Sequence, residues 1–123
     1  MDQKDFVFLN AEMFIHRKTI PPSSRWEETA RSLCRTQIDF FRDYGLLQPD
    51  AAVLHAPLDK AIIRFSDFTP EGQEFIMTAA TDKWLRACDR KQTVEAYKDP
   101  SGLIKRLKKF REQKDGQGNK SPR

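Results

Sequence analysis

The sequence is poor in the residues that most often carry catalysis, metal binding or membrane insertion. Its two cysteines and two histidines do not occur at the short C-x-x-C or H-x-x-x-H spacings that place two metal ligands on one turn. It contains no G-x-S-x-G elbow and no P-loop, and no apolar run near the roughly 20 residues that span a membrane. We therefore expect a non-enzymatic protein with no catalytic residues, no metal, no cofactor and no membrane partner.

The same scarcity predicts the cellular compartment. The apolar cluster Phe6–Leu9 is too short for a secretory signal, and it follows two aspartates and one lysine rather than a basic segment. Cys34 and Cys88 each fall on the apolar stripe of a predicted helix, where cysteine usually behaves as a small buried hydrophobe. We expect a cytoplasmic protein whose two cysteines are reduced core residues.

The sequence has instead many aromatic residues and an uneven distribution of charge. Nine Phe and two Trp are enough to pack one hydrophobic core in a chain of 123 residues. Residues 101–123 carry 8 basic and 2 acidic side chains, whereas the preceding hundred residues carry 14 basic and 16 acidic ones. The net charge of +4 therefore reflects the C-terminal end rather than the folded surface.

Hydrophobic periodicity predicts three helices. The first covers residues 24–44, begins at a serine cap (Ser23 or Ser24) and ends at Gly45. The second begins at the Thr69–Pro70 start signal and continues to about residue 90, and the third begins near residue 100. Their apolar stripes consist of Trp26, Ala30, Leu33, Cys34, Ile38, Phe41 and Tyr44, then Phe75, Ile76, Ala79, Ala80, Trp84, Ala87 and Cys88, and finally Leu103, Ile104, Leu107 and Phe110.

The remaining segments are predicted as strands or irregular chain. Residues 5–20 fit a strand, two short strands or a helix, and their β-branched and aromatic content favours a strand; a proline-containing connector follows. The apolar runs 51–55 and 61–65, separated by a Pro- and Asp-containing turn, predict a β-hairpin. Residues 91–98 form a polar segment, and residues 114–123 have no apolar side chain to bury, which predicts a disordered basic tail.

Residues 40–75 resemble part of a known family. They contain FFRDYGLL, then the predicted hairpin with DKAIIRF, then DFTPEGQEF at a helix start. This order is similar to the helix, wing and following LT-x-x-G helix of winged-helix regulators of the MarR or PadR kind. The resemblance implies a small bacterial DNA-associated regulator of transcription. Such regulators are often homodimers, for which the helices that contain Trp84 or Phe110 would supply the interface.

The resemblance also implies nucleic-acid contacts, on the recognition helix and on the wing respectively: Arg31, Arg35, Thr36, Gln37 and Arg42, and Lys60 and Arg64. Independently of it, the basic C-terminal helix offers a second route to phosphate, and the alternative is a solvated amphipathic helix. The side chains on this second route are Lys105, Arg106, Lys108, Lys109 and Arg111.

The sequence departs from the winged-helix pattern at one place. Residues 26–44 show uninterrupted helical periodicity where a helix-turn-helix has a tight turn before its recognition helix. The second hypothesis is therefore an immunity- or antitoxin-like protein that binds and blocks a protein partner. In either case we predict a single, mostly helical α+β domain over residues 1–113, winged-helix-like, with a small β-hairpin or three-stranded sheet and a C-terminal helix, followed by the tail at 114–123.

Overall fold

The computed structural model describes residues 5–15, 24–91 and 93–120. It is mostly helical with a two-stranded antiparallel sheet, which confirms the predicted α+β class. In chain order its elements, with η for a turn of 3₁₀ helix, are β1 (Val7–Asn10), α1 (Ala11–Ile15), α2 (Ser24–Asp43), η1 (Ala52–His55), η2 (Leu58–Lys60), β2 (Ile62–Arg64), η3 (Phe65–Asp67), α3 (Pro70–Ile76), α4 (Ala80–Lys91), α5 (Val94–Tyr97) and α6 (Ser101–Lys120).

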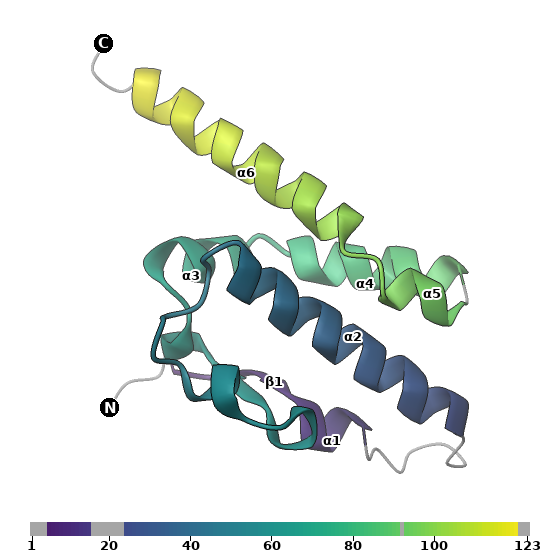
Figure 1. Cartoon of the computed structure of the whole chain (residues 1–123). Coiled ribbons are helices and arrows are strands. Elements are labelled where there is room, and N and C mark those ends of the chain that lie inside the picture. Colours follow the sequence, from purple (N-terminus) through teal and green to yellow (C-terminus); the bar gives the residue numbers. More distant parts are fainter. Residues whose placement is uncertain (1–4, 16–23, 92, 121–123) are drawn as a thin grey trace.

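Helix α2 crosses the middle of the molecule between two layers (Figure 1). One layer contains β1, α1 and the η turns, and the other contains α4, α5 and α6. Leu33, Cys34 and Phe41 are buried, as the helical periodicity predicts. The helix ends before Gly45, whose φ of +70° is the left-handed conformation that glycine adopts at little cost. The predicted connector and the Ser23 cap lie outside the described residues.

The predicted β-hairpin is wrong. Residues 52–55 and 58–60 form 3₁₀ turns that close their own hydrogen bonds, as in the bond from Ala61 N to Leu58 O at 3.1 Å. Strand β2 pairs instead with β1, antiparallel, with Val7 opposite Arg64. Because 3₁₀ turns satisfy the backbone donors locally, the two apolar runs do not pair with each other. The sheet therefore joins distant segments, and residues 5–15 form both a strand and a short helix.

The predicted second long helix is two helices. Thr69 caps α3 as expected, since its Oγ1 accepts a hydrogen bond from Gly72 N at 3.1 Å. The chain then turns at residues 77–79, where Ala79 has a φ of 67°, before α4 begins. The polar segment that follows contains α5, which Thr93 caps by accepting from Ala96 N.

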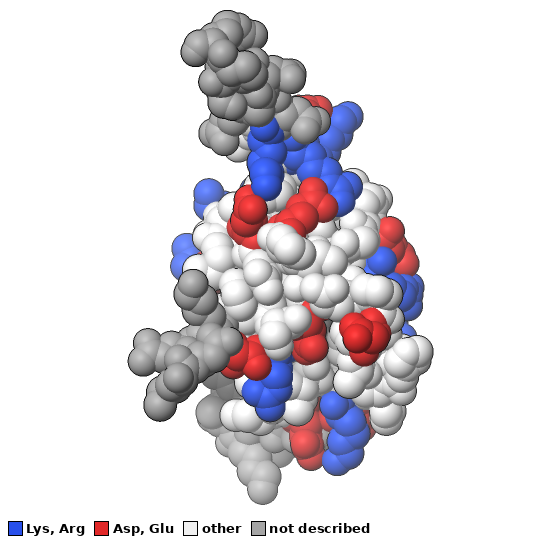
Figure 2. All heavy atoms as spheres, turned by 90° about the vertical axis from the view of Figure 1, so that its left-hand side faces the viewer, with Lys and Arg blue, Asp and Glu red and all other residues white. Residues whose placement is uncertain are grey.

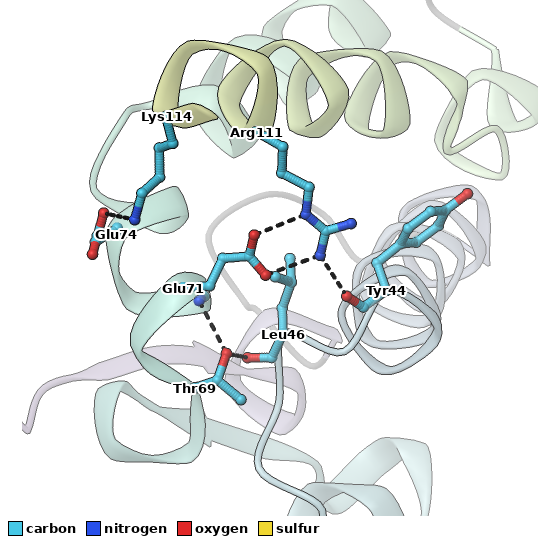
Figure 3. A network of polar contacts seen from close by, with 8 residues as sticks. Tyr44, Leu46, Thr69, Glu71, Glu74, Arg111 and Lys114 are labelled. Carbon is cyan, nitrogen blue, oxygen red and sulfur yellow. Dashed lines mark hydrogen bonds and ion pairs between the residues drawn. The ribbon is translucent and has the colours of Figure 1, made fainter. Parts of the chain in front are cut away.

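Helix α6 begins where the sequence predicts but continues to Lys120, beyond the predicted start of the disordered tail at residue 114. Leu103 and Leu107 are buried. Past them, Arg111 binds both carboxylate oxygens of Glu71 at 2.8 and 2.9 Å, and Lys114 binds Glu74 at 2.7 Å. Figure 3 shows these two pairs, which join α6 to α3.

The core uses both cysteines and both candidate dimer residues. Cys34 and Cys88 are buried free thiols, which confirms that prediction. Trp84 is buried, and its Nε1 donates to Asp99 O at 3.1 Å. Phe110 packs edge-on against Phe75, with ring centroids 5.5 Å apart. Trp84 therefore offers little surface to a second subunit, and dimerisation stays a prediction, as does the winged-helix arrangement.

Candidate functional site

A solvent-open groove of about 690 Å³ runs along α2. Its floor is one side of α2, one wall comes from η2, and the other wall comes from the end of α5 and the start of α6. The residues that line it are Arg31, Ser32, Arg35, Thr36, Asp39, Phe40, Asp43, Tyr44, Leu58, Lys98, Pro100 and Ile104. Its volume lies in the range of protein ligand sites.

The floor of the groove carries charges in a regular order. Arg31, Arg35, Asp39 and Asp43 recur every four residues, which places them along one stripe of α2. The acidic pair lies toward the C-terminal end of the helix, where carboxylates cost about 0.3–1 kcal/mol each because they meet the negative end of the helix dipole. The stability of the isolated helix therefore does not account for this order.

Most of these charges are neutralised within the fold. The Arg31 guanidinium binds both oxygens of Asp59 and, at 3.1 Å, Glu27, and these bonds raise its pKa. The Arg31–Asp59 pair attaches η2 to α2, whereas Glu27 lies on α2 itself. The two groove carboxylates share Arg42 as their partner, at 3.3 Å to Asp39 and 3.0 Å to Asp43.

Two cations in the groove differ from the rest. Arg35 and Lys98 are exposed and form no ion pair with any residue in the described ranges. They come from separate elements, but the Thr36 hydroxyl donates to Tyr97 O at 2.6 Å. This buried bond fixes the residue after Arg35 to the residue before Lys98. The two groove cations without an ion pair among the described residues are therefore held on neighbouring stretches of backbone.

The remaining lining is apolar or aromatic. Leu58 and Ile104 are partly buried residues from the two walls. Phe40 and Tyr44 lie along the floor with tilted rings whose centroids are 5.3 Å apart, and Phe40 is buried beneath it. Tyr44 is partly exposed, and its hydroxyl makes no hydrogen bond to any described residue. The groove thus offers apolar contact, together with one hydroxyl and two cations that have no polar partner among the described side chains.

The α2 side chains predicted to contact DNA do not form one surface. Thr36 and Gln37 are only 7% and 6% exposed, which corrects the prediction that they point outward. Arg31 and Arg42 are exposed in part but paired with carboxylates, as described above. Arg35 alone of the five is both exposed and without an ion pair among the described residues.

The two predicted wing contacts, Lys60 and Arg64, do not lie on a hairpin, because residues 51–65 form none. Lys60 lies on η2 and binds Glu12 of α1 at 3.3 Å. Arg64 is exposed at the end of β2. The structure therefore places them on the layer that contains the sheet, and neither lines the α2 groove.

The basic residues of α6 remain available in part. Lys105, Lys108 and Lys109 are exposed and have no ion pair among the described residues. Arg106 is partly buried, with an Nε atom that finds no hydrogen-bond partner in the described part of the chain. Arg111 is held by Glu71. Figure 2 shows Lys and Arg side chains gathered around α6, above a largely uncharged face.

Other chemistry has little support in the described residues. They include no group of three His, Cys, Asp or Glu side chains placed to hold a metal ion, and none of their helices is both long and apolar enough to cross a bilayer. Burial raises the pKa of Cys34 to about 12, which disfavours the nucleophilic thiolate. His55 is exposed on η1 and does not line the groove.

Comparison of the chain with known protein families, with curated proteins and with solved structures found no match. Any function proposed for the groove must therefore be argued from its geometry and its charges. Sequence reasoning found Arg35 on α2 but missed Lys98, Leu58 and Ile104 as its neighbours. The four-residue charge stripe was the available signal for the floor, whereas the two walls arise from contacts between distant segments.

Proposed function

We propose that this chain is a non-enzymatic, immunity- or antitoxin-like protein that binds a protein partner through the groove along α2. The groove carries the proposal because it combines an apolar lining with charged groups that the fold does not use. Protein-binding surfaces commonly have an apolar centre and a polar rim. A partner segment that covers Tyr44 and Ile104 would bury apolar surface and could also meet Arg35 and Lys98.

The state of the predicted DNA contacts favours this function over a recognition helix in α2. Affinity for DNA depends on cations that neutralise phosphates and release counterions. Arg31 and Arg42 already neutralise carboxylates of this chain, so phosphate contacts would have to displace those pairs. Thr36 and Gln37 would have to leave the interior.

Site-specific photo-crosslinking in the source cells tests the proposal. A benzophenone amino acid at Ser32, in the groove, should yield a discrete adduct with one protein, whereas the same residue at exposed Lys83 on α4 should not. The purified partner should then bind the chain stoichiometrically, and Ile104→Glu should weaken that binding while Lys83→Glu does not. Equal crosslinking from both positions, or binding that ignores Ile104→Glu in a correctly folded variant, would contradict the groove as the site.

A second candidate function, a DNA-associated regulator, is favoured by one observation. Lys105, Lys108 and Lys109 leave one exposed face of α6 with three unpaired positive charges among the described residues. Such a face contacts phosphates without reading sequence. This candidate places the DNA on α6 rather than on α2.

Fluorescence anisotropy of labelled duplex DNA over a salt series tests the second candidate. Replacing the three α6 lysines by Gln should reduce the slope of log affinity against log salt by about 2.7, since each phosphate contact contributes about 0.9. The matched control is Gln at Lys83, Arg90 and Lys91, which removes the same charge from α4. Similar slopes for the two triple variants would exclude α6 as the contact.

A further inference from the structure

The groove contains two cations, Arg35 and Lys98, that form no ion pair with any described residue, and they specify its ligand more closely than the proposed function does. Its carboxylates, Asp39 and Asp43, are both bound by Arg42, and Arg31 is bound by Asp59 and Glu27. The charges without a partner in the described residues are those of Arg35 and Lys98.

We infer that the groove binds an acidic segment of its protein partner, with carboxylates at Arg35 and Lys98 and at least one apolar side chain over Tyr44 and Ile104. This inference rests on the proposed function and names the chemistry of the segment. A guanidinium and an ammonium group that line one groove, with no ion pair among the described residues, favour an anion. The guanidinium binds a carboxylate through two parallel hydrogen bonds.

The position of the two cations is fixed by the fold. The Thr36–Tyr97 hydrogen bond is buried and short at 2.6 Å, so the end of α5 cannot move from α2 without breaking it. Lys98 is the C-terminal cap of α5, with its backbone N–H bonded to Ala96 O and Glu95 O. The backbone beneath both cations is therefore ordered before binding, and a partner pays mainly for ordering the two side chains.

The same groove disfavours a basic segment. A cation brought near Asp39 or Asp43 would compete with Arg42, which is already held by both carboxylates, while it approached the free charges of Arg35 and Lys98. Like charges placed opposite each other across an interface are a strong source of discrimination. An acidic segment is attracted to Arg35 and Lys98 and leaves the Arg42 pairs intact.

The apolar part of the site limits the ligand further. Leu58 and Ile104 approach the groove from the two walls, and the exposed ring of Tyr44 lies on the floor between them. An anion without an apolar group, such as inorganic phosphate or an oligonucleotide backbone, would leave these side chains uncovered. The inferred segment therefore combines Asp or Glu with a side chain such as Leu or Phe.

Selection from a phage-displayed library of random twelve-residue peptides tests this inference on the full chain. Wild type should select peptides rich in Asp and Glu with at least one Leu or Phe, whereas the Arg35→Glu, Lys98→Glu variant should not. A fluorescein-labelled copy of the most enriched peptide should bind wild type in an anisotropy titration. It should bind the charge-reversed variant at least about tenfold more weakly. The matched control, Lys83→Glu with Lys91→Glu, changes the net charge equally on α4 and should retain binding.

The outcomes separate this inference from the proposed function. Selected peptides without acidic enrichment that lose affinity on Ile104→Glu would overturn the acidic ligand but keep the groove as a protein site. Peptides that bind regardless of all groove variants, or no selection at all, would overturn both. A labelled single-stranded twelve-nucleotide DNA that binds as tightly as the peptide, with the same dependence on Arg35 and Lys98, would show a generic anion site and overturn the peptide assignment. Circular dichroism of each variant checks that the exposed substitutions leave the fold intact.

Discussion

Replacing Gly72 by alanine should destabilise the protein, although alanine has a higher helix propensity than glycine. A Cβ at Gly72 would lie 2.3 Å from Leu46 O and 3.0 Å from Phe68 Cδ1. The carbonyl of Leu46 cannot easily move, because it accepts hydrogen bonds from Thr69 N at 2.9 Å and from Thr69 Oγ1 at 3.3 Å (Figure 3). The close approach of α3 to the chain after α2 therefore requires glycine.

The expected loss follows from three opposing effects. Overpacking costs about 1–3 kcal/mol, and disturbing the two hydrogen bonds to Leu46 O costs about 1 kcal/mol each. The gain in helix propensity from glycine to alanine is about 1 kcal/mol. We therefore expect Gly72→Ala to lower the free energy of unfolding by about 2–4 kcal/mol, a large part of the 5–15 kcal/mol typical of a domain.

Urea denaturation followed by far-ultraviolet circular dichroism measures this loss. Gly102→Ala is the matched control, since its Cβ would lie 3.1 Å from Trp84 Cδ1, a contact that a movement of a few tenths of an ångström relieves. The control should stay within about 1 kcal/mol of wild type, because a small strain is offset by helix propensity. A Gly72→Ala variant as stable as wild type would refute the close contact between α3 and Leu46.

Three further predictions concern the cap, the thiols and the polar network. Thr69→Ala should lower the free energy of unfolding by about 1 kcal/mol in the same urea assay, because α3 loses its N-cap; a change near zero would contradict the cap. Cys34 and Cys88 should react with a thiol reagent at pH 8 only on unfolding, since burial raises the pKa of both; rapid labelling of the native protein would show that the core opens. Hydrogen bonding to Arg111 lowers the pKa of Glu71 from its ordinary 4.5, so the stability that this carboxylate contributes is present above pH 4.5 and is lost as the pH falls through the lowered pKa. Glu71→Gln should therefore flatten the acid limb of a stability–pH curve, and an unchanged limb would argue against the pair.

The parts of the fold that were predictable are those set by local sequence. The spacing of Leu33, Cys34 and Phe41 specified α2, and Gly45 specified its end. Thr69 and Pro70 specified the start of α3. These signals act within one or two helical turns, so a single sequence contains them in full.

The predictions that were wrong concern contacts between distant segments and a turn that contains no glycine or proline. The run at residues 61–65 does contain a strand, but its partner is β1, which no rule for neighbouring segments identifies. The break between α3 and α4 occurs at Ala79 without a glycine or proline to announce it. The groove was predictable only in its α2 floor, because Leu58, Lys98 and Ile104 reach it through tertiary packing.

The pairing of β1 with β2 also sets an order of events during folding. β1 emerges from the ribosome well before β2, and its pairing must wait until α2 and both 3₁₀ turns have been synthesised. Contacts between such distant segments carry a loop-closure cost and slow the search for the native state. Until that closure, the apolar side chains of Leu9 and Ile63, both buried in the finished fold, face water. This interval is when the nascent chain is most exposed to self-association and to chaperones.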